Sequence, residues 1–185
     1  MNIKAIAPIA IFVVTFFGLF SGCATPPVQT WHSIPQVQTI TGPTFEAQLE
    51  PVKEKDPFFV GFRLTVHNKT QSPLQVDWNA THYFHNGKDQ GILIFEGIDP
   101  ENIQGKIPPE SIAAGETFTR VIFPLRTIAF LPRSQRPEQG RRGFMAGVLP
   151  AGESKIVLSL KQNDQQLQTS LSLRLKAETS QPPSK

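Results

Sequence analysis

Apolar and polar side chains alternate along several short runs of this 185-residue chain. Such a two-residue period predicts half-buried β-strands, because successive side chains of a strand point to opposite faces of a sheet. The strongest run covers residues 58–68, and the segment 74–78 repeats the pattern with Trp78 facing inward. The apolar positions of the stronger run share one face: Val60, Phe62, Leu64 and Val66.

Further strands are expected along the rest of the chain, and the sequence offers no long amphipathic helix. Asn86-Gly87 suits the positive φ values of a two-residue hairpin turn, and residues 156–160 and 167–175 alternate around a polar turn at 163–166. The remaining expected strands are 44–49, 92–95, 117–125, 128–131 and 143–149. Short strands separated by turns predict an all-β fold, an antiparallel immunoglobulin-like β-sandwich.

The middle of the chain also carries a resemblance. The run from Phe62 to Val76, with its turn Asn68-x-Thr70-x-x-Pro73, resembles immunoglobulin-like sandwich domains of exported bacterial proteins. Asp77-Trp78-Asn79 ahead of the Asn-Gly turn is similar to an element of uncharacterised bacterial lipoproteins. The resemblance implies a fold and carries no active site.

The N-terminal segment has the features of an export signal. Lys4 precedes an apolar run from Ala5 to Phe20 that contains Pro8 and is 16 residues long. A membrane-spanning helix needs roughly 20 apolar residues, so the run predicts a signal-peptide core rather than a permanent span; an uncleaved anchor is the alternative.

The apolar run ends in Leu19-Phe20-Ser21-Gly22-Cys23. This stretch resembles the lipobox of bacterial lipoproteins, in which signal peptidase II cuts before the cysteine and lipid is attached to it. Phe20 stands where the family prefers Leu. The resemblance implies a lipidated Cys23, and Ala24 in place of Asp implies the outer membrane of a two-membrane cell, with the domain facing the periplasm.

These features divide the chain into four parts. We expect a signal peptide over 1–22, a lipidated N-terminus and Pro-rich spacer over 23–43, a β-sandwich domain over 44–176, and a disordered tail over 177–185. Proline-rich chain favours extended, poorly packed conformations, which is the reason for the spacer.

Composition excludes several classes of function. Loss of the leader removes Lys4 alone, which leaves 17 basic against 15 acidic side chains, too small an excess to indicate a nucleic-acid partner. The single cysteine cannot form a disulfide within the chain, and a lipidated sulfur offers no free thiol for catalysis or metal binding.

Two groups of side chains are candidates for a site. His82, His85 and Asp77, with His67 nearby in the sequence, carry ligand types that bind zinc or copper, although residues three apart on a strand face opposite ways. The second group lies in the polar loop 132–143 and holds four arginines that could contact carboxylates or phosphates: Arg133, Arg136, Arg141 and Arg142.

No enzyme signature is present. The chain has no Gly-x-Ser-x-Gly elbow and no phosphate-binding glycine loop, so we expect a non-enzymatic protein without a cofactor. The leading hypothesis is a lipid-anchored envelope protein, held to the membrane by its N-terminal lipid, whose domain binds another envelope component or supports an envelope assembly. A metal- or small-ligand-binding lipoprotein is the alternative, and a hydrolase is the third.

Overall fold

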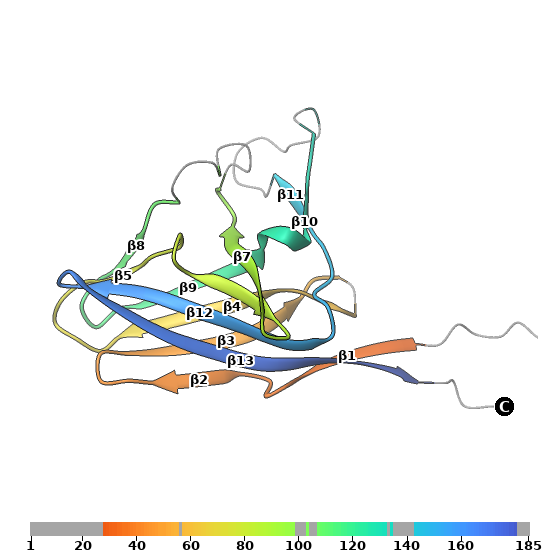
Figure 1. Ribbon diagram of the computed structural model, residues 1–185, viewed down its shortest axis with the longest axis horizontal. Coiled ribbons are helices and arrows are strands. Elements are labelled where there is room, and N and C mark those ends of the chain that lie inside the picture. Colours follow the sequence, from red (N-terminus) through yellow and green to blue (C-terminus); the bar gives the residue numbers. More distant parts are fainter. Residues whose placement is uncertain are drawn as a thin grey trace, which may run out of the picture.

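The computed structural model describes residues 28–55, 57–98, 103, 107–132, 134 and 143–180. These residues form an antiparallel all-β sandwich, which confirms the predicted fold class (Figure 1). A 3-10 turn, η2 (Leu125–Thr127), lies between β9 and β10. The strands are β1 (Val28–Ile34), β2 (Gln38–Thr41), β3 (Phe45–Lys53), β4 (Phe59–Asn68), β5 (Leu74–Val76), β6 (His82–His85), β7 (Lys88–Phe95), β8 (Glu110–Ile112), β9 (Thr117–Pro124), β10 (Ile128–Phe130), β11 (Phe144–Ala146), β12 (Gly152–Gln162) and β13 (Gln165–Ser180).

One curled sheet provides both layers of the sandwich. Its strand order is β1-β13-β12-β6-β7-β9-β4-β3-β2, with β5 joined to β12 and β8 joined to β5. Strand β7 links the layers because its first half pairs with β6 and its last residues pair with β9. Strand β2 at one end of the order contacts β13 near the other, so the sheet nearly closes on itself.

Three of the four apolar residues predicted to share one face of β4 line the main core, whereas Val60 belongs to a separate cluster, because the β3–β4 register shifts between Val52 and Lys53. Phe62, Leu64 and Val66 of β4 are fully buried and belong to one cluster with Leu158 and Leu171 from the opposite layer. Burying one such side chain contributes about 1.5–3 kcal/mol, so the alternation read from the sequence is also the main source of stability.

A second, smaller cluster lies on the other side of the β4–β9 layer. It contains Val60, Ile94, Phe123 and Phe144, and the rings of Phe123 and Phe144 meet edge to face with centroids 5.4 Å apart. Phe144 belongs to β11, which pairs only with β10, so this separate β10–β11 ribbon covers the cluster. The ribbon is thereby fixed to the body by apolar packing.

The two predicted hairpins are present. His85 pairs with Lys88 across Asn86 and Gly87, whose φ values are 47° and 78°. The longest hairpin, β12–β13, turns at Asn163 and Asp164, with φ values of 47° and 63°. Left-handed conformations at both central residues give the turn twist that suits a two-residue hairpin.

The expected domain boundaries change at both ends. Residues 28–41, assigned to the spacer, form β1 and β2, and β1 pairs with β13 along its whole length up to Val28↔Ser180. The same pairing makes residues 177–180 part of a strand rather than of a disordered tail. Pro35 and Pro43 lie in the connections on either side of β2, where the missing N–H is tolerated, so their presence did not signal a spacer.

Candidate functional site

The residues that carry the anchoring hypothesis lie outside the described part of the chain. This holds for Cys23 with the whole predicted leader, and also for the loop arginines Arg133, Arg136, Arg141 and Arg142. The structure describes the strands that flank that loop and the strand that follows Cys23.

The β10–β11 ribbon presents the arginine-containing loop. Leu131 N–H donates to Gly143 O at 3.0 Å, which holds the two ends of the loop together, and Gly147 N–H donates to Thr127 O at 2.7 Å at the base of the ribbon. Figure 1 shows β10 and β11 rising from the body of the sandwich beside β7. The loop therefore leaves from the tip of a projecting ribbon.

The ribbon and the chain that follows it expose large apolar side chains. Phe130 is 45% exposed, Met145 is 62% exposed and Val148 is 44% exposed. Among the described residues only Ile34 and Val37 are large apolar side chains of comparable exposure. Phe130 pairs with Phe144 and Met145 pairs with Ala129, so the two exposed side chains lie on opposite faces of the ribbon near the loop.

The structure does not gather the candidate metal ligands. His82 Nδ1 lies 2.9 Å from Asp89 Oδ2, and His85 Nε2 lies 3.0 Å from Asn86 Nδ2. His67 Nδ1 lies 3.0 Å from Thr117 Oγ1 on β9. Within the described ranges there is no group of three or more His, Cys, Asp or Glu side chains placed to hold a metal ion.

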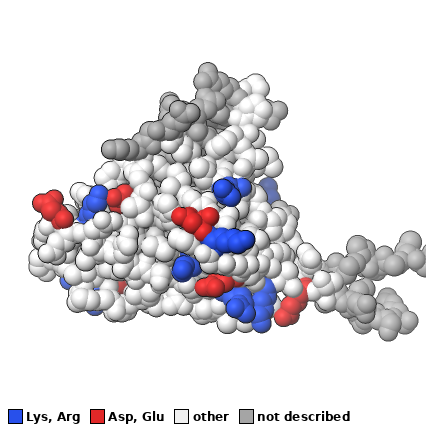
Figure 2. Space-filling model, viewed as in Figure 1, with Lys and Arg blue, Asp and Glu red and all other residues white. Residues whose placement is uncertain are grey.

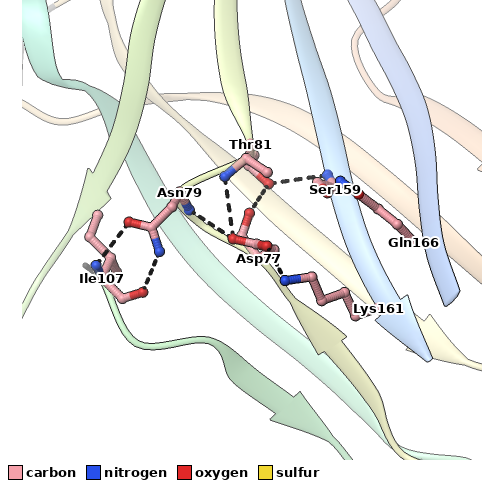
Figure 3. A network of polar contacts seen from close by, with 8 residues as sticks. Asp77, Asn79, Thr81, Ile107, Ser159, Lys161 and Gln166 are labelled. Carbon is pink, nitrogen blue, oxygen red and sulfur yellow. Dashed lines mark hydrogen bonds and ion pairs between the residues drawn. The ribbon is translucent and has the colours of Figure 1, made fainter. Parts of the chain in front are cut away.

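Asp77 organises a turn instead (Figure 3). Its Oδ1 accepts the N–H groups of Asn79 and Ala80 at 3.2 and 3.3 Å, and its Oδ2 accepts Lys161 Nζ at 2.7 Å. The hydrogen bond from Lys161 lowers the pKa of the Asp77 carboxyl, an effect that its burial opposes in part. The carboxylate ties the β5–β6 connection to β12.

The neighbours of Asp77 extend this network. Thr81 Oγ1 donates to Asp77 O at 2.8 Å and accepts Ser159 N–H at 3.1 Å. Asn79 exchanges two hydrogen bonds with the backbone of Ile107, at 2.7 and 3.0 Å (Figure 3). The Asp-Trp-Asn element singled out in the sequence is thus a structural junction between two connections and β12.

A partly exposed cation, Arg120, lies nearby, and no pattern in the sequence indicated its contacts. Glu110 on β8 accepts the indole N–H of Trp78 at 3.1 Å and also pairs with Arg120 of β9. The guanidinium of Arg120 lies 5.0 Å from the ring centre of Phe95 and 5.4 Å from that of Phe118. These residues come from β7, β8, β9 and the β5–β6 connection, so no local motif could have indicated the arrangement.

The described residues form a cleft with a volume of about 380 Å³. It lies over β3, β4 and β9 and is lined by cations and acids together: Lys53, Arg63, Arg120, Glu54 and Glu96. Figure 2 likewise shows basic and acidic side chains next to one another on the visible face, without a large area of one sign. This mixture offers no focused attraction for an ion of either charge.

A smaller groove of about 260 Å³ between β1 and β3 is lined by His32, Ser33 and Glu50, among others. Each of these side chains interacts with a different group. His32 lies 3.4 Å from Glu178, Ser33 Oγ donates to Gln36 O at 3.5 Å, and Glu50 accepts Arg63 at 2.5 Å. No hydrogen-bonded relay of nucleophile, base and acid joins them, as acyl transfer would require.

Comparisons with known proteins give no match: no family model, no curated protein and no solved structure is similar to this chain. In the part of the chain that the structure describes, no helix has the length and apolar character needed to cross a bilayer.

Proposed function

We propose that this chain is a lipid-anchored, non-enzymatic protein of a bacterial envelope. Lipid on Cys23 holds it to the membrane, in the outer membrane facing the periplasm where two membranes exist. The sandwich carries the β10–β11 ribbon, and the loop at the tip of the ribbon binds an acidic component of the envelope through Arg133, Arg136, Arg141 and Arg142.

The observation that carries the proposal is the construction of the ribbon. The Phe123–Phe144 contact fixes it to the body, while Phe130 and Met145 remain exposed beside the loop. A stretch with four arginines and one glutamate leaves from its tip. Arginine forks bind carboxylates and phosphates in bidentate geometry, and exposed apolar side chains add contact area.

The other polar candidates have roles within the fold. Asp77 accepts hydrogen bonds from its own turn and from Lys161, and His82 contacts Asp89. These side chains stabilise turns and strand pairing, which supports a binding role for the domain in place of a catalytic one.

The anchor and the contact surface are tested separately. Cys23→Ser is expected to abolish incorporation of labelled fatty acid and to release the protein from the membrane fraction. Unchanged labelling and fractionation of this variant would refute the anchor.

For the contact surface, all four loop arginines are replaced by Ser, and crosslinking in cells is compared with the parent. The matched control replaces four exposed basic residues elsewhere, namely Lys55, Lys88, Arg174 and Lys176, and so removes the same charge. We expect the crosslinked partner to be lost only from the loop variant. Equal capture by the parent and the loop variant would refute the contact site.

A further inference from the structure

The first described strand begins close to the proposed anchor. Val28 opens β1 and stands five residues after Cys23. Fully extended chain spans at most about 3.6 Å per residue, so the start of β1 lies within about 18 Å of the cysteine. The Pro-rich spacer expected from the sequence would have allowed about four times that distance, because it ran to residue 43.

The position of β1 selects one end of the sandwich. Strand β12 begins at Gly152, which pairs with Leu175, whereas β1 and β13 continue as far as Val28↔Ser180. This part of β1 and β13 thus extends past β12 as a two-stranded ribbon, and Figure 1 shows it leaving the right-hand end of the body.

The connection between β3 and β4 lies beside this extension. Lys53 Nζ donates to Trp31 O of β1 at 2.6 Å and lies 4.9 Å from the ring centre of Phe59. Trp31 is three residues from Val28, a separation of about 10 Å along a strand. This contact therefore holds the β3–β4 connection near the start of β1.

We infer that the end of the sandwich formed by the β3–β4 connection and the first residues of β1 faces the lipid headgroups of the membrane that holds the Cys23 lipid. This inference rests on the proposed function, since it needs lipid on Cys23. The opposite end, with the β4–β5 connection and the β12–β13 turn, faces away from the membrane.

The tether, and not the charge of this end, sets the orientation. Exposed Lys53, Lys55 and Lys176 lie at the same end as the exposed acids Glu54 and Glu178, so these side chains leave an excess of only one positive charge. Charges of mixed sign at the surface are also screened within about 8 Å at physiological ionic strength. The orientation should therefore be the same on zwitterionic and on anionic membranes, and at low and high salt.

The test uses the single cysteine of the chain. Once the Cys23 sulfur carries lipid, an introduced cysteine is the only thiol, so a fluorophore can be placed at one position. The full lipidated protein is prepared with Lys55→Cys and, as the matched control, with Gln71→Cys; both native side chains are exposed. Strand β4, which separates the two positions, has ten residues and spans about 33 Å.

Each labelled protein is placed in phosphatidylcholine vesicles that contain a nitroxide-headgroup lipid. We expect the fluorophore at position 55 to be quenched several-fold more strongly than the one at position 71. A Gly/Ser insert of about twenty residues after Thr25, which adds about 25 Å of root-mean-square reach, should remove most of that difference.

Two failures can be told apart. Mass analysis of the same samples reports lipid on Cys23, and its absence would refute the anchor and this inference together. Lipid on Cys23 with equal quenching at both positions, or with stronger quenching at position 71, would refute the orientation and leave the anchor intact.

Discussion

Replacing Asp77 tests whether this carboxylate stabilises the fold as a charged acceptor. In Asp77→Ala the N–H groups of Asn79 and Ala80 lose their side-chain acceptor and Lys161 loses its partner. Hydrogen bonds to a charged group contribute about 1.5–3 kcal/mol at good geometry, and these backbone contacts are long. The pair with half-exposed Lys161 contributes about 0–1 kcal/mol.

The expected total loss is about 2–3 kcal/mol, a fall of about 4–12 °C in Tm for a domain of this size. Asp77→Asn keeps an acceptor oxygen and loses the charge, so it should cost about 1 kcal/mol. Lys161→Met removes only the ion pair and serves as the control, with a loss of at most about 1 kcal/mol.

The dependence on pH gives the sharper test. Because the folded pKa of Asp77 is lowered, its stabilising contribution is present above the unfolded pKa and is lost as the pH falls through the folded pKa. The difference in unfolding free energy between the parent and Asp77→Asn should therefore shrink as the pH falls below about 4. Urea unfolding of the full protein in detergent at several pH values measures it. A difference that stays constant with pH, or a loss below about 0.5 kcal/mol for Asp77→Ala at pH 7, would refute the reasoning.

Three further predictions concern the body of the sandwich. Gly61→Ala would place a Cβ 2.7 Å from the ring of Phe123 and 2.8 Å from a β9 carbonyl, so chemical denaturation should show a loss of stability of about 1–3 kcal/mol. The control is Gly42→Ala, whose Cβ would meet nothing closer than 3.6 Å and which should change stability by less than about 0.5 kcal/mol. Asn68→Ala leaves the carbonyls of three other residues without their shared amide donor, and a loss of about 2–4 kcal/mol by the same method is expected; near-wild-type stability would contradict this. Tyr83 is the sole tyrosine, and burial raises the pKa of its phenol. In an ultraviolet titration the folded protein should therefore ionise at a higher pH than the unfolded chain, whose tyrosine has a pKa of about 10. The free energy of unfolding should fall as the pH rises above about 10. Coincident titration curves for the folded and unfolded protein would show that Tyr83 is accessible.

The sequence predicted the strands whose side chains alternate strictly. Residues 58–68 were expected to form a strand with Phe62 and Leu64 inward, and both are fully buried in β4. Trp78 was expected in the core and is fully buried. These predictions succeed because period-two burial is a local property that each strand carries in its own residues.

The strands that the sequence did not predict are those that form through pairing with a neighbouring strand. Strand β1 has few apolar positions and is followed by Pro35, so it was expected to be a spacer, and only its pairing with β13 makes it part of the sheet. Strand β8 was missed for the same reason, since its three residues are held by β5. An edge strand hydrogen-bonds to a neighbour along one side only, so its apolar and polar side chains need not alternate regularly.

The amino-acid sequence alone determined the fold class, the two tight hairpin turns and the proposed place of the anchor at Cys23. Each of these depends on neighbours within a few residues. The tertiary structure decided that Asp77 and the histidines interact with separate partners, that Glu110 joins Trp78 to Arg120, and that the domain begins five residues after Cys23. Those facts depend on contacts between residues far apart in the chain, which become neighbours only when the sheet curls and its layers pack.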